Sequence, residues 1–522
     1  MRRTFARSGC AVLIMIGLPL FGLAGVQAQS AGSWLQWGRT AQHNENSPVA
    51  GQSPQAQLAD VNFDPFVAAE QAESREGALT AHYQDPLIDG DTTFMEFKTG
   101  YWVPCNPPGS HVPYPCGPDA WNWEIWNERA FSWQNGVFAE KWNFQSDWIP
   151  EPNSDVNDVG DKSGFGLQGW EPVFHAAISG GHVFVPGASG SVYELDEVNG
   201  AMLQHFMPFG SDPKTYVSGP LTIDASGNLY YNAMALDPTR PWTKDVTGAW
   251  LVKVAPDGTS RLADYNQLVP GGRRICFGFI SCGSQRPSIN IAPAISPDGK
   301  TLYTVSRSHI FFYYSYVVAV NTGDLSPKWN VSLTRLQNQD SEDFASDLSS
   351  STPAVAPDGS IFYGALSEEG SYGDGDLLKL SPNGEYLGAF HFGWDITPAI
   401  YPHDGTYSLI IKNNYYRTQG PYFITQLNSA LKPEWSFKNE TFNSDHPNGY
   451  EWCVNAPAVD ANGSVYANSE DGNIYVIDQG GTFNSKIFLK VAIEAAYTPI
   501  AIGPDGLIYG ENDGDLFVIG SQ

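Results

Sequence analysis

The sequence has little positive charge. It contains 28 lysine and arginine residues against 56 aspartate and glutamate residues, which gives a formal charge of −28. A surface this acidic repels the phosphates of nucleic acids and of anionic lipid heads, so we expect no nucleic acid partner. One explanation for the excess of acidic residues is solubility outside the cytoplasm, and the alternative is attraction of divalent cations.

Long apolar runs are also scarce, and the clearest one stands at the N-terminus. Arg2, Arg3 and Arg7 precede the run CAVLIMIGLPLFGLAG, and Val26 and Ala28 are small residues placed for cleavage. Residues 1–28 are therefore predicted to be a cleaved export signal, of the general or the twin-arginine type. We expect the rest, residues 29–522, to be a single periplasmic or secreted domain with no membrane span.

Cysteine is rare, with six residues in the chain. Cys105 and Cys116 bracket one short Gly/Pro-rich loop, and Cys276 and Cys282 bracket another. Because export favours oxidation, two local disulfides are predicted. Cys453 is left over and is interpreted as a small buried apolar residue.

Several catalytic signatures are missing. There is no C-x-x-C-H haem attachment motif, no H-E-x-x-H zinc motif and no Gly-rich phosphate loop. The segment DVNDVGD (155–161) lacks the closing glutamate of a calcium loop. Covalently bound haem and zinc-dependent hydrolysis are therefore unsupported.

What the chain does contain is a repeated hairpin. TPAVAPDGSIFYGA begins at Thr352, and near-copies begin at Ala292, Ala456 and Thr498. Each copy places Asp-Gly or Asn-Gly between two short apolar runs, which is the pattern of a tight turn between two β-strands.

Further strands follow each hairpin. Runs such as SVYELD and IYVID supply a third strand, and KPEWSFK and AEKWNFQ supply a fourth. Four antiparallel strands in succession make one propeller blade, so the chain is predicted to be an all-β, eight-bladed β-propeller of four-stranded antiparallel blades, with seven blades as the alternative. The innermost strands are expected to start near Pro86, Ala176, Pro220, Pro293, Pro353, Pro398, Pro457 and Pro499.

The last blade is one strand short. Only three strands fit between Pro499 and the last residue, whereas Trp34 and Trp37 resemble the outer-strand tryptophans of other blades. We expect residues near 33–40 to supply the missing outer strand and so close the ring with an N-terminal strand. A loose N-terminal arm is the alternative.

The repeat resembles that of pyrroloquinoline-quinone (PQQ)-type, quinoprotein dehydrogenase-like eight-bladed propellers. SEDGNIYVIDQGG (469–481) and GASGSVYELDEVNG (187–200) are the best matches, and the similarity covers roughly residues 85–520. The resemblance implies the fold. It leaves activity open, because that superfamily contains quinone-dependent alcohol and sugar dehydrogenases and also proteins that bind no quinone.

In a propeller the residues just before each innermost strand surround the axis. These are the candidate ligand-binding residues at the channel mouth, and they serve equally well as polar partners for strand ends: Asp85, His175, Ser218, Asn290, Ser351, Asp395, Asn455 and Tyr497.

A quinone would need an aromatic floor, basic residues and a Ca²⁺ held by oxygen ligands. The residues that could serve are Trp394, Asp395, Arg286, Asn455 and Glu171. The sequence lacks the adjacent cysteine pair found in many of the resembling enzymes. PQQ and Ca²⁺ are therefore possible cofactors, but neither is predicted firmly, and no metal ligands are assigned.

The segment from about 101 to 150 is read as an aromatic insertion, linked by the Cys105–Cys116 disulfide. Its tryptophans could bind a protein or a glycan, or could pack the insertion against the blades.

The leading hypothesis is an exported binding or scaffolding propeller without its own catalytic centre. The alternatives are a quinone- and calcium-dependent oxidoreductase, and a polysaccharide-binding or polysaccharide-cleaving propeller with His175 as base and Tyr497 as acid. Whether the protein is an enzyme stays open.

Overall fold

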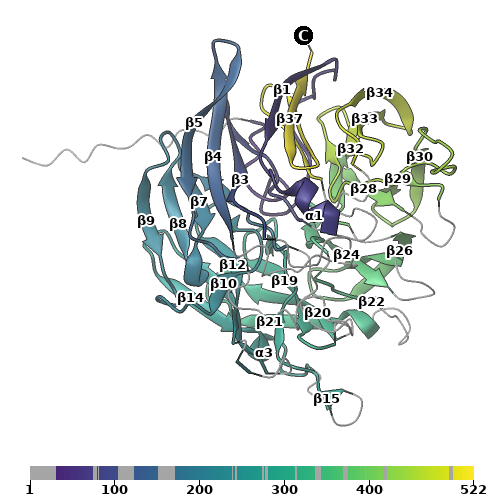
Figure 1. Ribbon diagram of the computed structural model, residues 1–522. Helices are drawn as coiled ribbons and strands as arrows, with labels where there is room; N and C mark the ends of the chain where they lie inside the picture. Colours follow the sequence, from purple (N-terminus) through teal and green to yellow (C-terminus); the bar gives the residue numbers. More distant parts are fainter. Residues whose placement is uncertain are drawn as a thin grey trace, which may run out of the picture.

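The protein is a ring of eight β-sheets with very short helices (Figure 1), which confirms the predicted fold class. The computed structural model describes residues 31–521 except for 74–78, 80, 104–122, 151–170, 238, 241–243, 273–274, 277–279, 312–313, 336–342, 348, 368–373, 394–395, 415–419 and 493–497. Within these residues no helix is both long and apolar enough to cross a bilayer.

In seven of the blades the strands run from innermost to outermost in chain order, whereas the eighth takes its outermost strand from the N-terminal region; neighbouring strands are antiparallel. The first four blades comprise β2 (Leu87–Asp89), β3 (Thr92–Gly100), β4 (Glu124–Gln134) and β5 (Val137–Gln145); β6 (Ala177–Ser179), β7 (His182–Pro186), β8 (Val192–Asp196) and β9 (Met202–Phe206); β10 (Thr215–Val217) with β11 (Thr222–Ile223), β12 (Leu229–Leu236), β13 (Val246–Val254) and β14 (Ser260–Asp264); and β17 (Gln285–Pro287) with β18 (Ala294–Ile295), β19 (Thr301–Ser308), β20 (Ser315–Asn321) and β21 (Pro327–Ser332).

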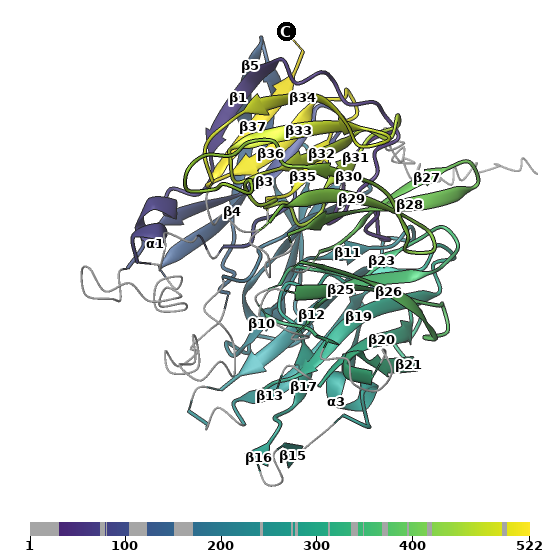
Figure 2. The same cartoon turned by 90° about the vertical axis from the view of Figure 1, so that its right-hand side faces the viewer.

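The other four blades complete the ring, as the turned view in Figure 2 also shows. They comprise β22 (Asp343–Phe344) with β23 (Ala354–Val355), β24 (Ile361–Ser367), β25 (Asp374–Leu380) and β26 (Tyr386–Gly393); β27 (Ala399–His403), β28 (Thr406–Asn413), β29 (Phe423–Asn428) and β30 (Pro433–Lys438); β31 (Ala458–Val459), β32 (Val465–Asn468), β33 (Asn473–Asp478) and β34 (Thr482–Phe488); and β35 (Ile500–Ile502), β36 (Ile508–Asn512), β37 (Asp515–Gly520) and β1 (Ala56–Asn62).

The elements outside the blades are small. Among the described residues they are α1 (Val67–Glu73), α3 (Tyr265–Leu268), the 3₁₀ turns η2 (Ala188–Gly190) and η3 (Leu333–Arg335), and a hairpin of β15 (Ile275–Cys276) and β16 (Ile280–Ser281).

The Asp-Gly and Asn-Gly turns form as the sequence predicts. Gly359 has φ +84° and Gly463 has φ +81°, a left-handed backbone that glycine adopts without steric cost. The preceding aspartate steadies the first of these turns, because Asp358 Oδ1 accepts a hydrogen bond of 2.9 Å from the Ser360 amide.

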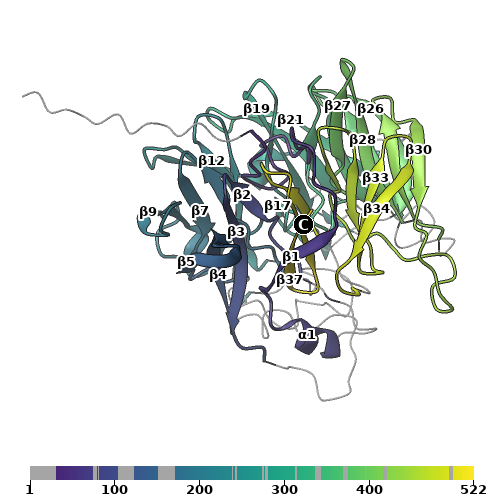
Figure 3. The same ribbon diagram turned by 90° about the horizontal axis from the view of Figure 1, so that it is seen from above.

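The ring is closed by an N-terminal strand, but the predicted residues are wrong. The outer strand of the eighth blade is β1 (Ala56–Asn62), which pairs with β37 from Ala56↔Gly520 to Asn62↔Asp515. Figures 1 and 3 both show the purple β1 beside the yellow β37. Residues 33–40 instead contact innermost strands, because Trp34 pairs with Ile88 of β2.

The aromatic segment after residue 123 belongs to the first blade. β4 and β5 are its two outer strands, and Trp126 and Trp142 are buried in its core. This part of the segment read as an insertion is therefore regular blade. Cys105, Cys116 and the side chain of Cys276 lie outside the described residues, so both disulfides stay predictions.

Candidate functional site

The segment of residues 34–52, here called the hub segment, contacts the innermost strand region of every blade in turn. Seven blades donate a backbone N–H to it, and the eighth accepts one. The bonds run from Ile88 to Trp34 O, Ile178 to Leu35 O, Ile223 to Gln36 Oε1, Ile295 to Ala41 O, Val355 to Gln42 O, Ile400 to Asn44 O and Val459 to Glu45 O, and from Gln52 N to Gly506 O. The hub segment therefore lies across one end of the propeller axis.

These contacts have a simple physical reason. The innermost strand of a blade has no neighbour on its axial side, so its amides need partners from elsewhere. At the third blade a side chain replaces the hub backbone, because Gln36 Oε1 accepts from Ile223 N at 2.8 Å and Gln36 Nε2 donates to Ile223 O at 3.3 Å.

Asp85 is held by the hub segment. Its carboxylate accepts hydrogen bonds from Gly38 N at 2.8 Å and from Trp34 Nε1 at 3.4 Å. Burial raises the pKa of Asp85 to about 7, although these two bonds act in the opposite direction. Burial and the nearby Asp85 raise the pKa of Glu45 well above its usual value, and Arg39 opposes this. The axis thus carries two buried acids.

Two buried histidines, His43 and His175, lie among these groups. His43 Nδ1 donates to Pro353 O at 2.9 Å, and His175 Nδ1 donates to Ala176 O. The His175 ring packs edge-on against Trp37, with ring centroids 5.4 Å apart. Burial lowers the pKa of His43 to about 4 and that of His175 to about 3, so both are neutral near pH 7.

The remaining described ring residues mostly bind neighbouring backbone or one another. Asn290 Oδ1 accepts from Val173 N at 2.8 Å, and Ser351 Oγ donates to Ile396 O at 2.8 Å. Asn455 Oδ1 accepts from Thr397 N at 3.3 Å, whereas its Nδ2 contacts Ser350 Oγ. Ser218 is buried and bonds through its backbone to Asn232 and Asn290.

Arg286 lies in a buried cluster of charges. Its guanidinium donates to both carboxylate oxygens of Asp347, at 2.9 and 2.5 Å, and Arg307 Nη1 donates to the same carboxylate at 2.9 Å. Burial by itself would raise the pKa of Asp347, but the two arginines outweigh burial and hold that pKa well below its usual range.

Glu171 binds Lys98 rather than facing an open axis. Lys98 Nζ lies 2.7 Å from Glu171 Oε1 and 2.8 Å from Asp64 Oδ2, and all three side chains are buried. Burial raises the pKa of Glu171 to about 8, while Lys98 acts to lower it. Glu96 and Glu511 are further buried acids with raised pKa values, and burial is the main cause for both.

The structure thus connects the candidate residues mainly to the protein itself, and their role in ligand binding stays a prediction. Trp394, Asp395 and Tyr497 lie outside the described residues. Sequence reasoning missed Glu45, His43 and Asp347. Glu45 and His43 lie in a segment without strand periodicity, and Asp347 lies in an acidic run that reads as solvent-exposed, so no local signal marked them.

The described residues do not fit a quinone with its Ca²⁺. Three cofactor carboxylates would need cations, yet Arg286 is engaged by Asp347 and Lys98 by Glu171. The axis instead presents the acids Glu45 and Asp85, which supply no positive charge to pair with those carboxylates. Within the described ranges no group of three His, Cys, Asp or Glu side chains is arranged to hold a metal ion.

No family model matches the sequence, and no curated protein matches it. Solved structures are similar in fold. A europium-containing methanol dehydrogenase superposes with a TM-score of 0.57 and 12% identity, covering 92% of this chain and 89% of that chain. The quinohemoprotein alcohol dehydrogenase of Comamonas testosteroni gives 0.53 and 12%, covering 94% and 81%. One from Pseudomonas putida HK5 gives 0.51 and 12%, covering 94% and 76%. The predicted resemblance to quinoprotein-type propellers is therefore confirmed at the level of the fold.

Proposed function

We propose that the protein is an exported propeller that binds or scaffolds a protein partner through its outer surface and has no catalytic centre of its own. The hub segment carries this proposal. It occupies one end of the axis, and the side chains of Asp85 and Ser351 beside it are hydrogen-bonded to other parts of the chain. A site that recognises a partner then has to lie on the blades or their turns.

The proposal separates cleanly from a quinone-dependent oxidoreductase, which the fold comparisons make the second candidate. Purified protein lacking residues 1–28 is titrated with PQQ and Ca²⁺, or with PQQ and a lanthanide, while melting temperature and alcohol-dependent dye reduction are followed. We expect neither a thermal shift nor turnover at saturating cofactor. A clear shift accompanied by turnover would overturn the proposal.

Binding of a partner needs its own measurement. A photo-crosslinking residue placed at exposed Leu203, and separately at exposed Phe442, is irradiated in exporting cells. We expect at least one position to give a discrete protein adduct after purification. If neither position gives an adduct, the proposal of a protein partner on this outer surface is wrong.

A glycan-active propeller has less support. His175, its proposed base, is buried against Trp37 and donates to a backbone carbonyl, and Tyr497 lies outside the described residues.

A further inference from the structure

One pair of positions recurs between the second and third strands of the blades. In the third blade Tyr230 lies opposite Lys253, and in the fifth blade Phe362 lies opposite Lys379. The strand register shows that the two pairs occupy equivalent positions. Tyr230 also pairs with Thr222, and Phe362 with Ala354. In both blades the next residue of the innermost strand donates its amide to the hub segment. In the second blade the pair is Phe184 and Glu194.

In the third blade the lysine fills the groove to the next blade. Lys253 Nζ lies 5.6 Å from the centre of the Tyr230 ring and donates to Thr322 O at 2.9 Å. Thr322 belongs to the turn between the outer strands of the fourth blade. The ammonium therefore rests on an aromatic face and reaches a carbonyl across the groove.

The fifth blade repeats this arrangement. Lys379 Nζ lies 5.6 Å from the Phe362 ring centre and 5.8 Å from that of Tyr407, and it donates to Ser429 O at 2.6 Å. Ser429 stands in the corresponding turn of the sixth blade. In both blades, therefore, a lysine ammonium fills the groove to the next blade.

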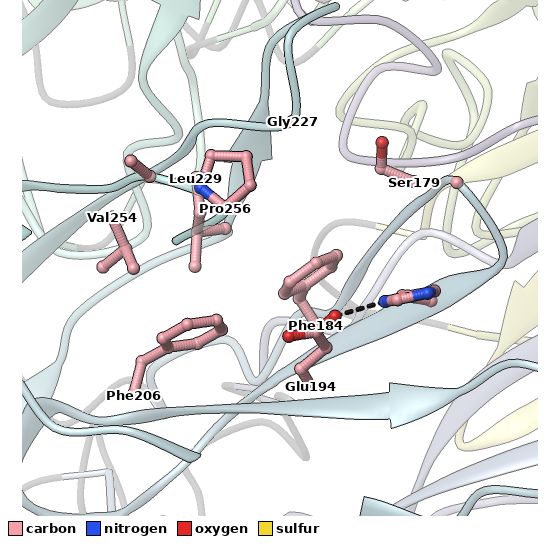
Figure 4. Close-up of a pocket in the computed structure, with 11 residues that line it drawn as sticks. Ser179, Phe184, Glu194, Phe206, Gly227, Leu229, Val254 and Pro256 are labelled. Carbon is pink, nitrogen blue, oxygen red and sulfur yellow. Dashed lines mark hydrogen bonds and ion pairs between the residues drawn. The ribbon is translucent and has the colours of Figure 1, made fainter. Parts of the chain in front are cut away.

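The second blade has a carboxylate where the other two have an ammonium. The groove between the second and third blades is an open pocket of about 290 Å³. Glu194 lies in it with its carboxylate against His182 Nδ1, and apolar side chains form the walls (Figure 4). These apolar residues are Phe184, Phe206, Leu229, Val254 and Pro256.

The far wall of the pocket also offers the matching acceptor. Pro256 follows Ala255, whose carbonyl closes the turn by accepting from Gly258 N. Thr322 and Ser429 follow Asn321 and Asn428, whose carbonyls also close their turns, by accepting from Leu325 N and Leu431 N. The Pro256 carbonyl therefore stands where the two lysine-filled grooves have the carbonyl that receives the ammonium.

We propose that this pocket binds a primary ammonium group on an aliphatic stem, supplied by a lysine side chain of a protein partner. The stem lies among Phe184, Phe206 and Val254, and the ammonium meets the Glu194 carboxylate and the Pro256 carbonyl. The formal charge of −28 favours approach of a basic partner. This inference rests on the proposed binding function and names the recognised group.

The test uses small probes on the full mature protein. Nα-acetyl-lysine methylamide, its uncharged counterpart Nα-acetyl-norleucine methylamide and butylamine are titrated, and binding is followed by ligand-observed NMR. We expect the lysine derivative and butylamine to bind and the norleucine derivative to bind at least tenfold more weakly. Equal binding of the norleucine derivative would overturn the ammonium assignment, and binding of butylamine without the lysine derivative would overturn the protein source.

Two variants locate the site. Glu194→Gln removes the charge and should weaken lysine binding at least tenfold. Glu194→Lys should fill the pocket as Lys253 and Lys379 fill theirs, so it should abolish binding while far-UV circular dichroism stays native. Glu385→Gln, on an exposed turn of the fifth blade, is the matched control and should bind as wild type. Unchanged binding in both Glu194 variants would refute the site whatever the outcome of the quinone titration.

Discussion

Trp34 and Ile88 exchange two backbone hydrogen bonds, Ile88 N to Trp34 O at 2.7 Å and Trp34 N to Ile88 O at 2.8 Å. This pair begins the path of the hub segment around the axis. Because β1 follows the hub segment and seals the eighth blade, residues 34–62 both seal the ring and cover one end of its axis. The hub segment should therefore be a stability determinant, which substitutions within it can test.

Gly38 is a closely packed point of the hub segment, against its own backbone. It has φ +62°, and a Cβ there would stand 2.6 Å from His43 Cα. We expect Gly38→Ala to destabilise the fold by about 3 kcal/mol, because strain and a backbone clash act together. Gly210 has φ +66°, and a Cβ added there would meet nothing within 4 Å. Gly210→Ala therefore measures the cost of the backbone conformation alone, about 1 kcal/mol of stability. Urea unfolding measures the loss of stability in each variant. If Gly38→Ala and Gly210→Ala lose the same free energy of unfolding, Gly38 is not closely packed.

Gln36 replaces a backbone link at the third blade. Gln36→Leu leaves the Ile223 amide and carbonyl without their partners, so a loss of about 2 kcal/mol is expected. Amide hydrogen exchange should quicken at Ile223 and much less at Ile400, which bonds to Asn44 O. Gln55→Leu, at an exposed position, is the control. Uniform exchange in the variant would contradict the local role of Gln36.

Glu128 should make stability depend on pH. Burial raises its pKa to about 8, against 4.5 in an unfolded chain, although a hydrogen bond from Gln84 Nε2 acts to lower it. Between these values the folded protein keeps a proton that the unfolded chain has released, so this residue lowers stability as pH rises.

Glu128→Gln removes that contribution. Its melting temperature should exceed that of wild type by several degrees at pH 9 and should differ little at pH 4.5. Glu385→Gln, which changes an exposed acid, should show no such trend. A difference between wild type and Glu128→Gln that is constant across pH would refute the assignment.

Asp347 neutralises two buried arginines. Asp347→Asn leaves Arg286 and Arg307 without their carboxylate, and a loss of about 4 kcal/mol is expected at pH 7. Because the pKa of Asp347 is lowered in the folded protein, its stabilising effect is present above the unfolded value and disappears as pH falls through the folded value. The difference in urea midpoint between wild type and Asp347→Asn should therefore become smaller in strong acid. Urea midpoints measured down to pH 2 check this, and a gap that widens would contradict it.

The repeated hairpin could be predicted from the sequence because its information is local. Asp358-Gly359 demands a left-handed turn, and the alternating apolar runs on either side demand a strand with one buried face. The runs SVYELD and IYVID became the third strands β8 and β33, and AEKWNFQ became the outer strand β5.

The placement of Trp34 and Trp37 could not be predicted this way. Both lie in a segment whose partners belong to different blades and can be more than 400 residues away along the chain, as Val459 is from Glu45. An aromatic residue near a turn looks the same whether it will cover an outer strand or an axis. The expectation of an outer strand at 33–40 failed for this reason, although closure by the N-terminal region was correct.

The sequence by itself therefore determined the strands, their turns and the need to close a ring, since each depends on neighbours a few residues apart. Only the tertiary structure decided which segment seals the eighth blade, which acids are buried around the axis, and that Glu194 stands where two other blades have lysine. Those outcomes depend on which blades become adjacent and which strand edges remain unpaired, and both are set only when the whole ring has closed.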